Sequence, residues 1–279
     1  MEYTQYPSRY LHIAGASAFG GTTHQVDDVK VEVKLPSIAH AHLPMAGGHS
    51  EVKAGKTSLN CGKVDFGNIS RQKLAQLRAI ELVSAGSGYA LSHSEPEAPG
   101  KPFGCRTVVQ IKSLKIVGGL SLKHGLVTMM SSHDTAKTTH PHITFGETVI
   151  SGLKLGKSEL KITLDIETFN KYPTLQGFEE AWQKDPKLRA KLSKRFVTDG
   201  DKLHKSAAGY VVGSIVKSIE GLPKDAELLD AYTINWPPIG RITVGEVFMA
   251  PFLRRISLLR FQERCGCGGS GCVGGMPYP

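Results

Sequence analysis

Runs of apolar residues, alone or alternating with polar ones, recur along most of this chain. Residues 29–35 alternate apolar and charged side chains with a period of two, which is typical of a half-buried strand. Four further runs follow closely after Arg106, and the first two meet at Gly118-Gly119, a good two-residue hairpin turn. Because such spacing favours antiparallel pairing over helical crossovers, we predict a mainly β protein, an antiparallel β-sandwich or barrel. The four runs are residues 107–117, 120–130, 142–153 and 158–166.

One helical segment interrupts this pattern near residues 175–196. Thr174 is a suitable N-cap, and Asp185-Pro186 restarts a second helix because proline is accepted at the first helical position. We expect the apolar stripe of this segment to cover one end or face of the β structure. The stripe comprises Leu175, Phe178, Ala181, Trp182, Leu188, Leu192 and Phe196. Further strands are predicted at residues 209–219, 232–236, 241–249 and 253–261.

The remaining segments set the predicted domain organisation. Ser70 can cap a short helix over residues 70–84, with a strand over 77–83 as the alternative. Residues 86–104 are rich in Ser, Pro and Gly, which predicts a long loop and a possible subdivision. We therefore expect one β-rich domain over residues 1–262 and a flexible Gly/Cys-rich C-terminal tail over residues 263–279.

The composition supports a folded chain with a real core. Hydrophobic residues make up 40% of the 279 residues and charged residues 21%, which is not a disordered composition. Aromatic residues make up only 7%, which does not favour a stacking platform for single-stranded nucleic acid.

Positive charge is concentrated in one stretch of the sequence. Residues 184–205 hold eight basic and three acidic residues, so they carry +5 of the net charge of +9. Such a stretch is either the solvated face of a helix or a surface for an anionic partner. The candidate basic surface comprises Lys184, Lys187, Arg189, Lys191, Lys194 and Arg195.

The first nine residues contain no apolar h-region of a classical secretory signal. The longest apolar runs are far too short to span a membrane as a helix. We expect synthesis in the cytoplasm, which leaves export by another route open.

Two histidine groups are candidate metal ligands. His40 and His42 are two residues apart, so in a strand both imidazoles lie on one face, and His49 or Glu51 can follow from the Gly-rich turn. Pro36 and Pro44 flank the pair, so the alternative is an irregular loop with surface histidines whose side chains diverge.

The second histidine group is His140 and His142, in a Thr-rich stretch near His133 and Asp134. A carboxylate beside histidines can act as a metal ligand or orient an imidazole. The alternative is turn chemistry, in which Ser, Thr and Asp side chains satisfy loop backbone groups.

The chain has five cysteines, an odd number, so at least one is free, bound to metal or paired with another chain. Cys265, Cys267 and Cys272 lie in the tail at a spacing that does not match a structural zinc site. We expect these three to serve assembly or disulfide bonding between chains, with a tail that has no role as the alternative.

The sequence contains no phosphate-binding loop, dinucleotide fingerprint, nucleophile elbow or zinc-protease motif. The leading hypothesis is a non-catalytic structural or binding protein without a cofactor. It self-associates into a homo-oligomer, and its tail contacts a neighbouring subunit or partner. The first alternative is a histidine-metal enzyme on a β-sandwich or barrel, with a divalent transition metal. The second is a basic adaptor that binds nucleic acid or another anionic surface.

Overall fold

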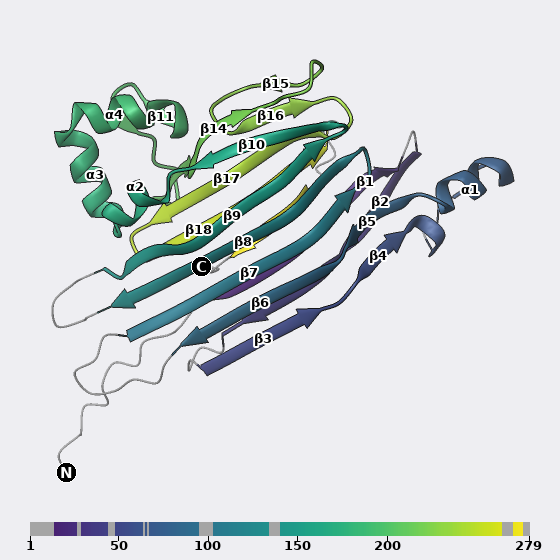
Figure 1. Ribbon diagram of the computed structural model, residues 1–279, viewed down its shortest axis with the longest axis horizontal. Coiled ribbons are helices and arrows are strands. Elements are labelled where there is room, and N and C mark those ends of the chain that lie inside the picture. The colour runs from purple at the N-terminus through teal and green to yellow at the C-terminus, as the bar shows by residue number, and fades with distance from the viewer. Residues whose placement is uncertain are drawn as a thin grey trace, which may run out of the picture.

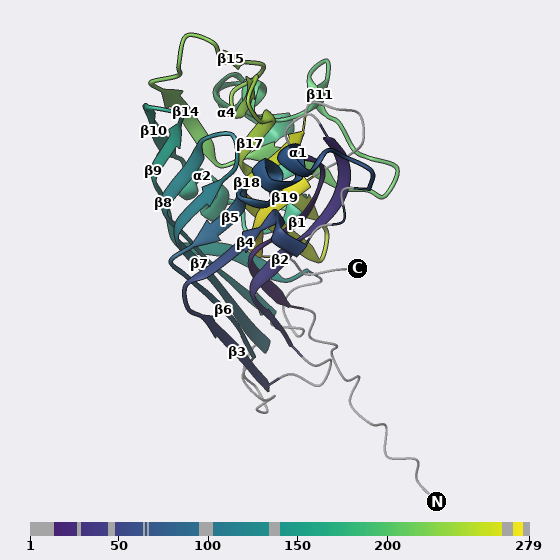
Figure 2. The ribbon, with the colours of Figure 1, turned by 90° about the vertical axis from the view of Figure 1, so that its right-hand side faces the viewer.

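The computed structural model describes residues 14–26, 29–43, 48–63, 65, 67–94, 103–133, 140–263 and 270–275. These residues form two large antiparallel sheets that pack face to face, with helices at the ends (Figures 1 and 2). The predicted mainly β, antiparallel fold is confirmed. No helix within these ranges is long and apolar enough to cross a bilayer.

The first sheet, here called the β1 sheet, has the order β15-β16-β17-β18-β19-β1-β2, and β13 also pairs with β17. Its strands are β1 (Gly15–Val26), β2 (Val29–His42), β13 (Val211–Ser214), β15 (Glu227–Leu228), β16 (Thr233–Trp236), β17 (Gly240–Ala250), β18 (Leu253–Glu263) and β19 (Ser270–Gly275).

The second sheet, here called the β8 sheet, has the order β14-β10-β9-β8-β7-β5-β4. β6 also pairs with β7, and β3 pairs with β6. The strands are β3 (Gly48–Ala54), β4 (Thr57–Asn60), β5 (Glu81–Ala85), β6 (Ser87–Ser94), β7 (Phe103–Ile116), β8 (Leu120–His133), β9 (His142–Leu155), β10 (Ser158–Leu164) and β14 (Val216–Glu220).

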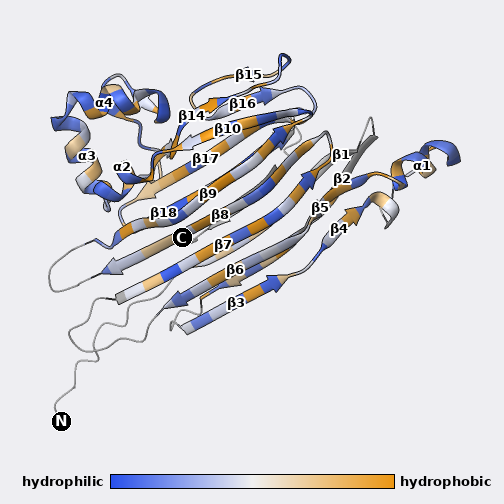
Figure 3. Cartoon of the chain, viewed as in Figure 1, coloured by the Kyte–Doolittle hydropathy of each residue, from blue (hydrophilic) through white to orange (hydrophobic). Residues whose placement is uncertain are grey.

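Alternating hydropathy explains why these strands form a sandwich. Figure 3 shows apolar and polar residues alternating along the long strands of the β8 sheet. Leu114, Leu122 and Leu153 are fully buried between the sheets, as are Val244 and Ile256 from the β1 sheet. Removing this apolar surface from water stabilises the sandwich by about 25 cal/mol per Å².

The predicted hairpin at Gly118-Gly119 is present between β7 and β8, but its turn has three residues, 117–119, rather than two, since Ile116 pairs with Leu120. Both glycines have a positive φ, of 86° and 91°, which costs little without a Cβ. An ideal Cβ on Gly118 would lie 2.8 Å from Pro238 O, so the turn also packs closely on the opposite sheet.

The predicted helical segment is present as α3 (Leu175–Lys184) and α4 (Pro186–Leu192), with α2 (Ile166–Lys171) just before it. All three gather at one end of the sandwich, here called the helical end (Figure 1). Thr174 Oγ1 accepts from Gly177 N at 3.0 Å, which caps α3 as predicted. Six residues of the predicted stripe are buried: Leu175, Phe178, Trp182, Leu188, Leu192 and Phe196. Beyond α4, β11 (Thr198–Asp199) and β12 (Lys202–Leu203) form a small two-stranded sheet.

Ser70 caps α1 (Arg71–Arg78), but this helix is shorter than the one predicted over residues 70–84, because residues 81–85 form β5. The loop predicted over residues 86–104 is wrong over β6. Gly88, Ala90, Ser92 and Ser94 all point into the core. An ideal Cβ on Gly88 would lie 2.5 Å from Ile38 Cγ2, so small residues are what lets β2 approach β6. Because β6 pairs on both sides, it does not separate two domains.

The prediction of a flexible tail is likewise wrong over β19 (Ser270–Gly275). This strand lies inside the β1 sheet, between β18 and β1, and pairs with both. Backbone hydrogen bonds need no apolar side chains, so a Gly-rich segment can fill a gap between two existing strands. The other tail residues, among them Cys265 and Cys267, lie outside the described residues.

Candidate functional site

Two edge strands, one from each sheet, lie on the same long side of the sandwich. β2 ends the β1 sheet and β3 ends the β8 sheet, and the two strands are in contact. The sheets are also joined here by a hydrogen bond from Ser92 Oγ to Ala41 O, at 3.3 Å. This side of the sandwich carries the first histidine group that the sequence predicted.

The edge formed by β2 is irregular. Its pairing with β1 shifts register twice, and Ala39 adopts a positive φ of 49°. Pro36 lacks an N–H group, so it cannot donate to a further strand. Bulges and prolines are devices that keep edge strands from pairing with other chains, so β2 is a poor template for a second strand.

The edge formed by β3 is regular. All seven residues of the strand pair with β6 without a register shift, and its other side pairs with no strand among the described residues. We call this unpaired side the β3 edge. His49, Glu51 and Lys53 are exposed along it.

Glu51 links the charged groups on this strand. It accepts from Lys53 Nζ at 2.8 Å and lies 3.6 Å from His49 Nε2. The bond from Lys53, helped by Tyr89 and His49, lowers the pKa of Glu51 although partial desolvation opposes the shift. Across the strands, the His49 ring meets the His93 ring edge-to-face, with centroids 5.5 Å apart. His93 Nδ1 is buried and has no hydrogen-bond partner among the described residues.

His40 and His42 form a separate pair on β2. Their Nε2 atoms are in direct contact, and the ring centroids are 4.2 Å apart. Both residues are exposed, whereas Ala39 and Ala41 between and beside them are buried. Burial and the charge of His42 both lower the pKa of His40, which favours the neutral imidazole.

The structure brings the predicted ligands together as pairs rather than as a group of four. His40 and His42 lie on the outer side of the β1 sheet, and His49 and Glu51 lie on the outer side of the β8 sheet. Among the described residues, no three His, Cys, Asp or Glu side chains are grouped to hold a metal ion. The expected divergence of the His40 and His42 side chains is wrong, because both lie on strand β2 and their Nε2 atoms are in contact.

The second histidine group is not joined to the first by any described contact. His140 packs edge-to-face on Phe252, with ring centroids 4.9 Å apart, and its Nδ1 is buried without a partner among the described residues. His142 is exposed at the start of β9, and Asp134 lies outside the described residues.

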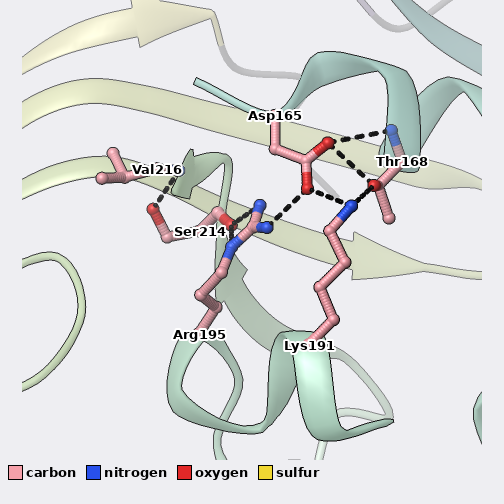
Figure 4. Close-up of polar contacts among 6 residues, drawn as sticks. All are labelled: Asp165, Thr168, Lys191, Arg195, Ser214 and Val216. Carbon is pink, nitrogen blue, oxygen red and sulfur yellow. Dashed lines mark hydrogen bonds and ion pairs between the residues drawn. The ribbon is translucent and has the colours of Figure 1, made fainter. Parts of the chain in front are cut away.

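The predicted basic surface is largely occupied by contacts within the fold. Arg195 is not a surface residue, since its side chain is only 4% exposed. It donates to Asp165 Oδ2 at 2.7 Å and to Ser214 O at 2.9 Å (Figure 4). The sequence could not reveal this, because the partner carboxylate lies thirty residues upstream.

Asp165 is the centre of this network. It caps α2 by accepting from Thr168, and it also pairs with Lys191 at 3.0 Å (Figure 4). Burial alone would raise the pKa of Asp165, but the bonds from Arg195, Thr168 and Lys191 outweigh it and hold that pKa well below its usual range. The network fastens the helical end to the β1 sheet through Ser214.

The other predicted basic residues divide into two groups. Arg189 donates to Trp182 O and Gln183 O at the C-terminal end of α3, and Lys184 pairs with Glu180 at 3.6 Å. Lys187 and Lys194 are exposed. The positive stretch in the sequence therefore yields a smaller basic surface than its charge indicated.

Sequence reasoning missed a second buried cation, Arg254 on β18. It is 2% exposed and donates to the carbonyl oxygens of Ile143, Phe169 and Tyr172. Burial lowers the pKa of Arg254 to about 10. Since two of these carbonyls lie at the C-terminal end of α2, the cation also meets the negative end of that helix. In the sequence, an arginine in an alternating strand is indistinguishable from one on an exposed face.

Cys61 and Cys105 do not pair with each other. Cys61 is fully buried and Cys105 is half-buried, and both are free thiols. Burial raises the pKa of both thiols, and for Cys61 burial is the only cause of the shift. Cys272 lies in β19, where its backbone is opposite Gly20 and Arg260.

A family model matches residues 10–250, most of the chain. The chain belongs to the family described as a domain of unknown function, DUF8256. The family match includes β2, β3 and the helical end, and it stops at the last residue of β17.

No curated protein and no solved structure matches the chain. Because the description of the DUF8256 family names no activity or ligand, the function has to be inferred from the geometry of the site.

Proposed function

We propose that this protein is a non-catalytic β-rich binding protein that self-associates by pairing its β3 edge with the β3 edge of a second copy. The observation that carries the proposal is a regular, exposed edge strand whose charges are arranged to complement themselves. An open edge has unpaired N–H and C=O groups, and an extended strand from another chain can satisfy them.

The order of charges along β3 supports an antiparallel, two-fold arrangement. With the two-fold axis through Val52, Glu51 of each copy is opposite Lys53 of the other. Opposite charges across strands are stabilising, and like charges directly opposite one another are destabilising. An axis through Glu51 would place the two copies of Glu51 against each other, so the charges favour the register centred on Val52.

The exchange of partners has a low cost. Glu51 already pairs with Lys53 within the chain, and both side chains are exposed, so neither has to be desolvated alone. When two chains pair, the Glu51–Lys53 contact within each chain is replaced by an equivalent Glu51–Lys53 contact between the chains. The net gain then comes from the backbone hydrogen bonds of the two edges.

This proposal moves the predicted self-association from the tail to an edge strand. Ser270–Gly275 is paired on both sides within its own sheet, so over these residues it has no free edge for a neighbour. A C265S/C267S/C272S variant tests the tail without removing β19. Association that persists in this variant, with or without reductant and chelator, supports the β3 edge. If this variant no longer associates, the tail cysteines, and not the β3 edge, mediate self-association.

The direct test is charge reversal on the full-length chain, measured by sedimentation equilibrium at micromolar concentration. We expect a wild-type dimer, an E51K variant whose association is weaker by about tenfold or more, and recovery in the E51K/K53E double variant. A wild-type monomer, or a double variant no better than E51K, would refute the pairing.

Glu147 supplies a matched control for net charge. It is an exposed residue on β9, inside the β8 sheet and away from either edge. E147K changes the net charge as much as E51K does, and we expect it to dimerise like the wild type. Equal weakening in E147K and E51K would show that overall charge, rather than the β3 edge, controls association.

A further inference from the structure

His40 and His42 are the most closely convergent pair of potential metal ligands among the described residues. Their Nε2 atoms are in direct contact, and both residues are exposed on the outer side of the β1 sheet. The two-residue spacing on one strand places both rings on the same face. Neither residue takes part in the proposed pairing of β3, so any role for this pair is independent of that proposal.

The surface beneath the pair is lined by very small residues. His42 is opposite Gly15 on β1, and His40 is opposite Ser17. Ser17 in turn is opposite Gly274 on β19. Cross-strand neighbours share a face, so the floor beside the two imidazoles is built from glycine and serine. No large side chain therefore projects from these cross-strand positions to block the approach of an ion.

We propose that His40 and His42 form a two-histidine site for a divalent transition metal, with the remaining coordination positions open to water or to a small ligand. Imidazole nitrogen suits Zn²⁺, Cu²⁺ and Ni²⁺, whereas Mg²⁺ and Ca²⁺ require oxygen ligands. The pair contains no carboxylate or carbonyl donor, so it selects the transition metals. Open positions are a property of metal sites that bind further ligands, which distinguishes this pair from a closed structural site.

The convergence has a structural cause in the strand itself. Ala39 adopts a positive φ just before the pair, and the chain continues with Ala41 buried against β6. The small buried alanines hold this part of β2 flat on the core, which fixes the direction of the two histidines on the other side. A site on a strand anchored in this way is better ordered than a site on a loop.

The test is a titration of the full-length chain with Zn²⁺ alone, followed by calorimetry, in the C265S/C267S/C272S background so that tail thiols do not compete. We expect saturable binding of one ion per chain. H40Q or H42Q should lower the affinity by about tenfold or more, and H40Q/H42Q should remove the binding, because each variant removes a nitrogen ligand. Excess Mg²⁺ or Ca²⁺ should not compete.

His49 provides the matched control. It is also an exposed histidine on an edge strand, but it pairs with Glu51 and His93 on the other sheet. H49Q should bind Zn²⁺ like the background protein. Zn²⁺ should also raise the melting temperature of the background protein and not that of H40Q/H42Q, since an ion bound only to the folded state stabilises it.

Absence of saturable Zn²⁺ binding in the background protein would overturn the proposal. So would binding that is unchanged in H40Q/H42Q while the metal-free variant melts normally. Electron paramagnetic resonance of bound Cu²⁺ gives a second readout, since two equatorial imidazole nitrogens are expected and a signal without nitrogen coupling would contradict the site.

Discussion

Arg195 at the helical end is buried and bonded to Asp165, whose side chain is only 10% exposed, whereas Glu51 and Lys53 on the β3 edge form an ion pair in the open. The Asp165–Arg195 pair holds together α2, the 3-10 turn that follows α4 (Ser193–Arg195) and β13, and it has no surface to offer a partner. The exposed pair contributes little to folding, because solvent screens it and its side chains remain free to move. Loss of a charge should therefore lower the free energy of unfolding in the first region and weaken self-association in the second.

The largest effect should come from breaking the packing of the helical end. Trp182 is buried and donates from Nε1 to Asp201 O at 2.8 Å, so W182A loses both a filled volume and a hydrogen bond. We expect a loss of about 4–5 kcal/mol in the free energy of unfolding. Urea denaturation measures it, with the exposed neighbour Gln183 as control, because Q183A should stay within about 0.5 kcal/mol of the wild type. If W182A left the free energy of unfolding nearly unchanged, the helical end would not contribute more to stability than the β3 edge does.

Removal of the Asp165 carboxylate should rank next. D165N leaves the Arg195 guanidinium buried without its counter-charge, and we expect it to cost about 3–4 kcal/mol in urea denaturation. K191Q removes the exposed partner of the same carboxylate and should cost about 0.5 kcal/mol. If D165N and K191Q lowered the free energy of unfolding equally, burial of the charges would not explain why the helical end and the β3 edge differ.

Acid should act on the helical end in a defined direction. The pKa of Asp165 is lowered in the folded chain, because the bonds from Arg195, Thr168 and Lys191 outweigh the effect of burial. Its contribution is complete above the unfolded-state pKa of about 4 and is lost as the pH falls from there towards the folded pKa. The difference in urea midpoint between wild type and D165N should therefore narrow below about pH 4. A constant difference down to pH 2.5 would contradict this assignment.

Local signals in the sequence were enough for the fold class and for the helical end. Alternation along residues 107–166 requires paired strands with one buried face, and Thr174 and Asp185 are caps whose effect is confined to one turn. β6 and β19 were missed because their glycines and serines have the composition of loops. Their small size serves close packing or strand insertion, which only the neighbouring strands reveal.

The candidate site was predictable only in part, for a related reason. The spacing of His40 and His42 predicts that they share a face, and they do. Their separation from His49 and Glu51 depends on β2 and β3 belonging to different sheets, which no local pattern encodes. Burial of Arg195 and Arg254 could not be predicted from the sequence either, because a buried cation depends on oxygen atoms supplied by distant segments.

Mixing two single variants tests most directly whether β3 edges pair with Glu51 opposite Lys53 of a second copy. The E51K chain has two positive charges at these positions and the K53E chain has two negative ones, so each should be monomeric alone at micromolar concentration. Mixed in equal amounts, they should form a one-to-one dimer, because each positive charge then lies opposite a negative one. Both variants should still unfold cooperatively, at a temperature below that of the wild type only by what dimerisation adds. A mixture that sediments as two monomers, with the wild type dimeric under the same conditions, would contradict the pairing.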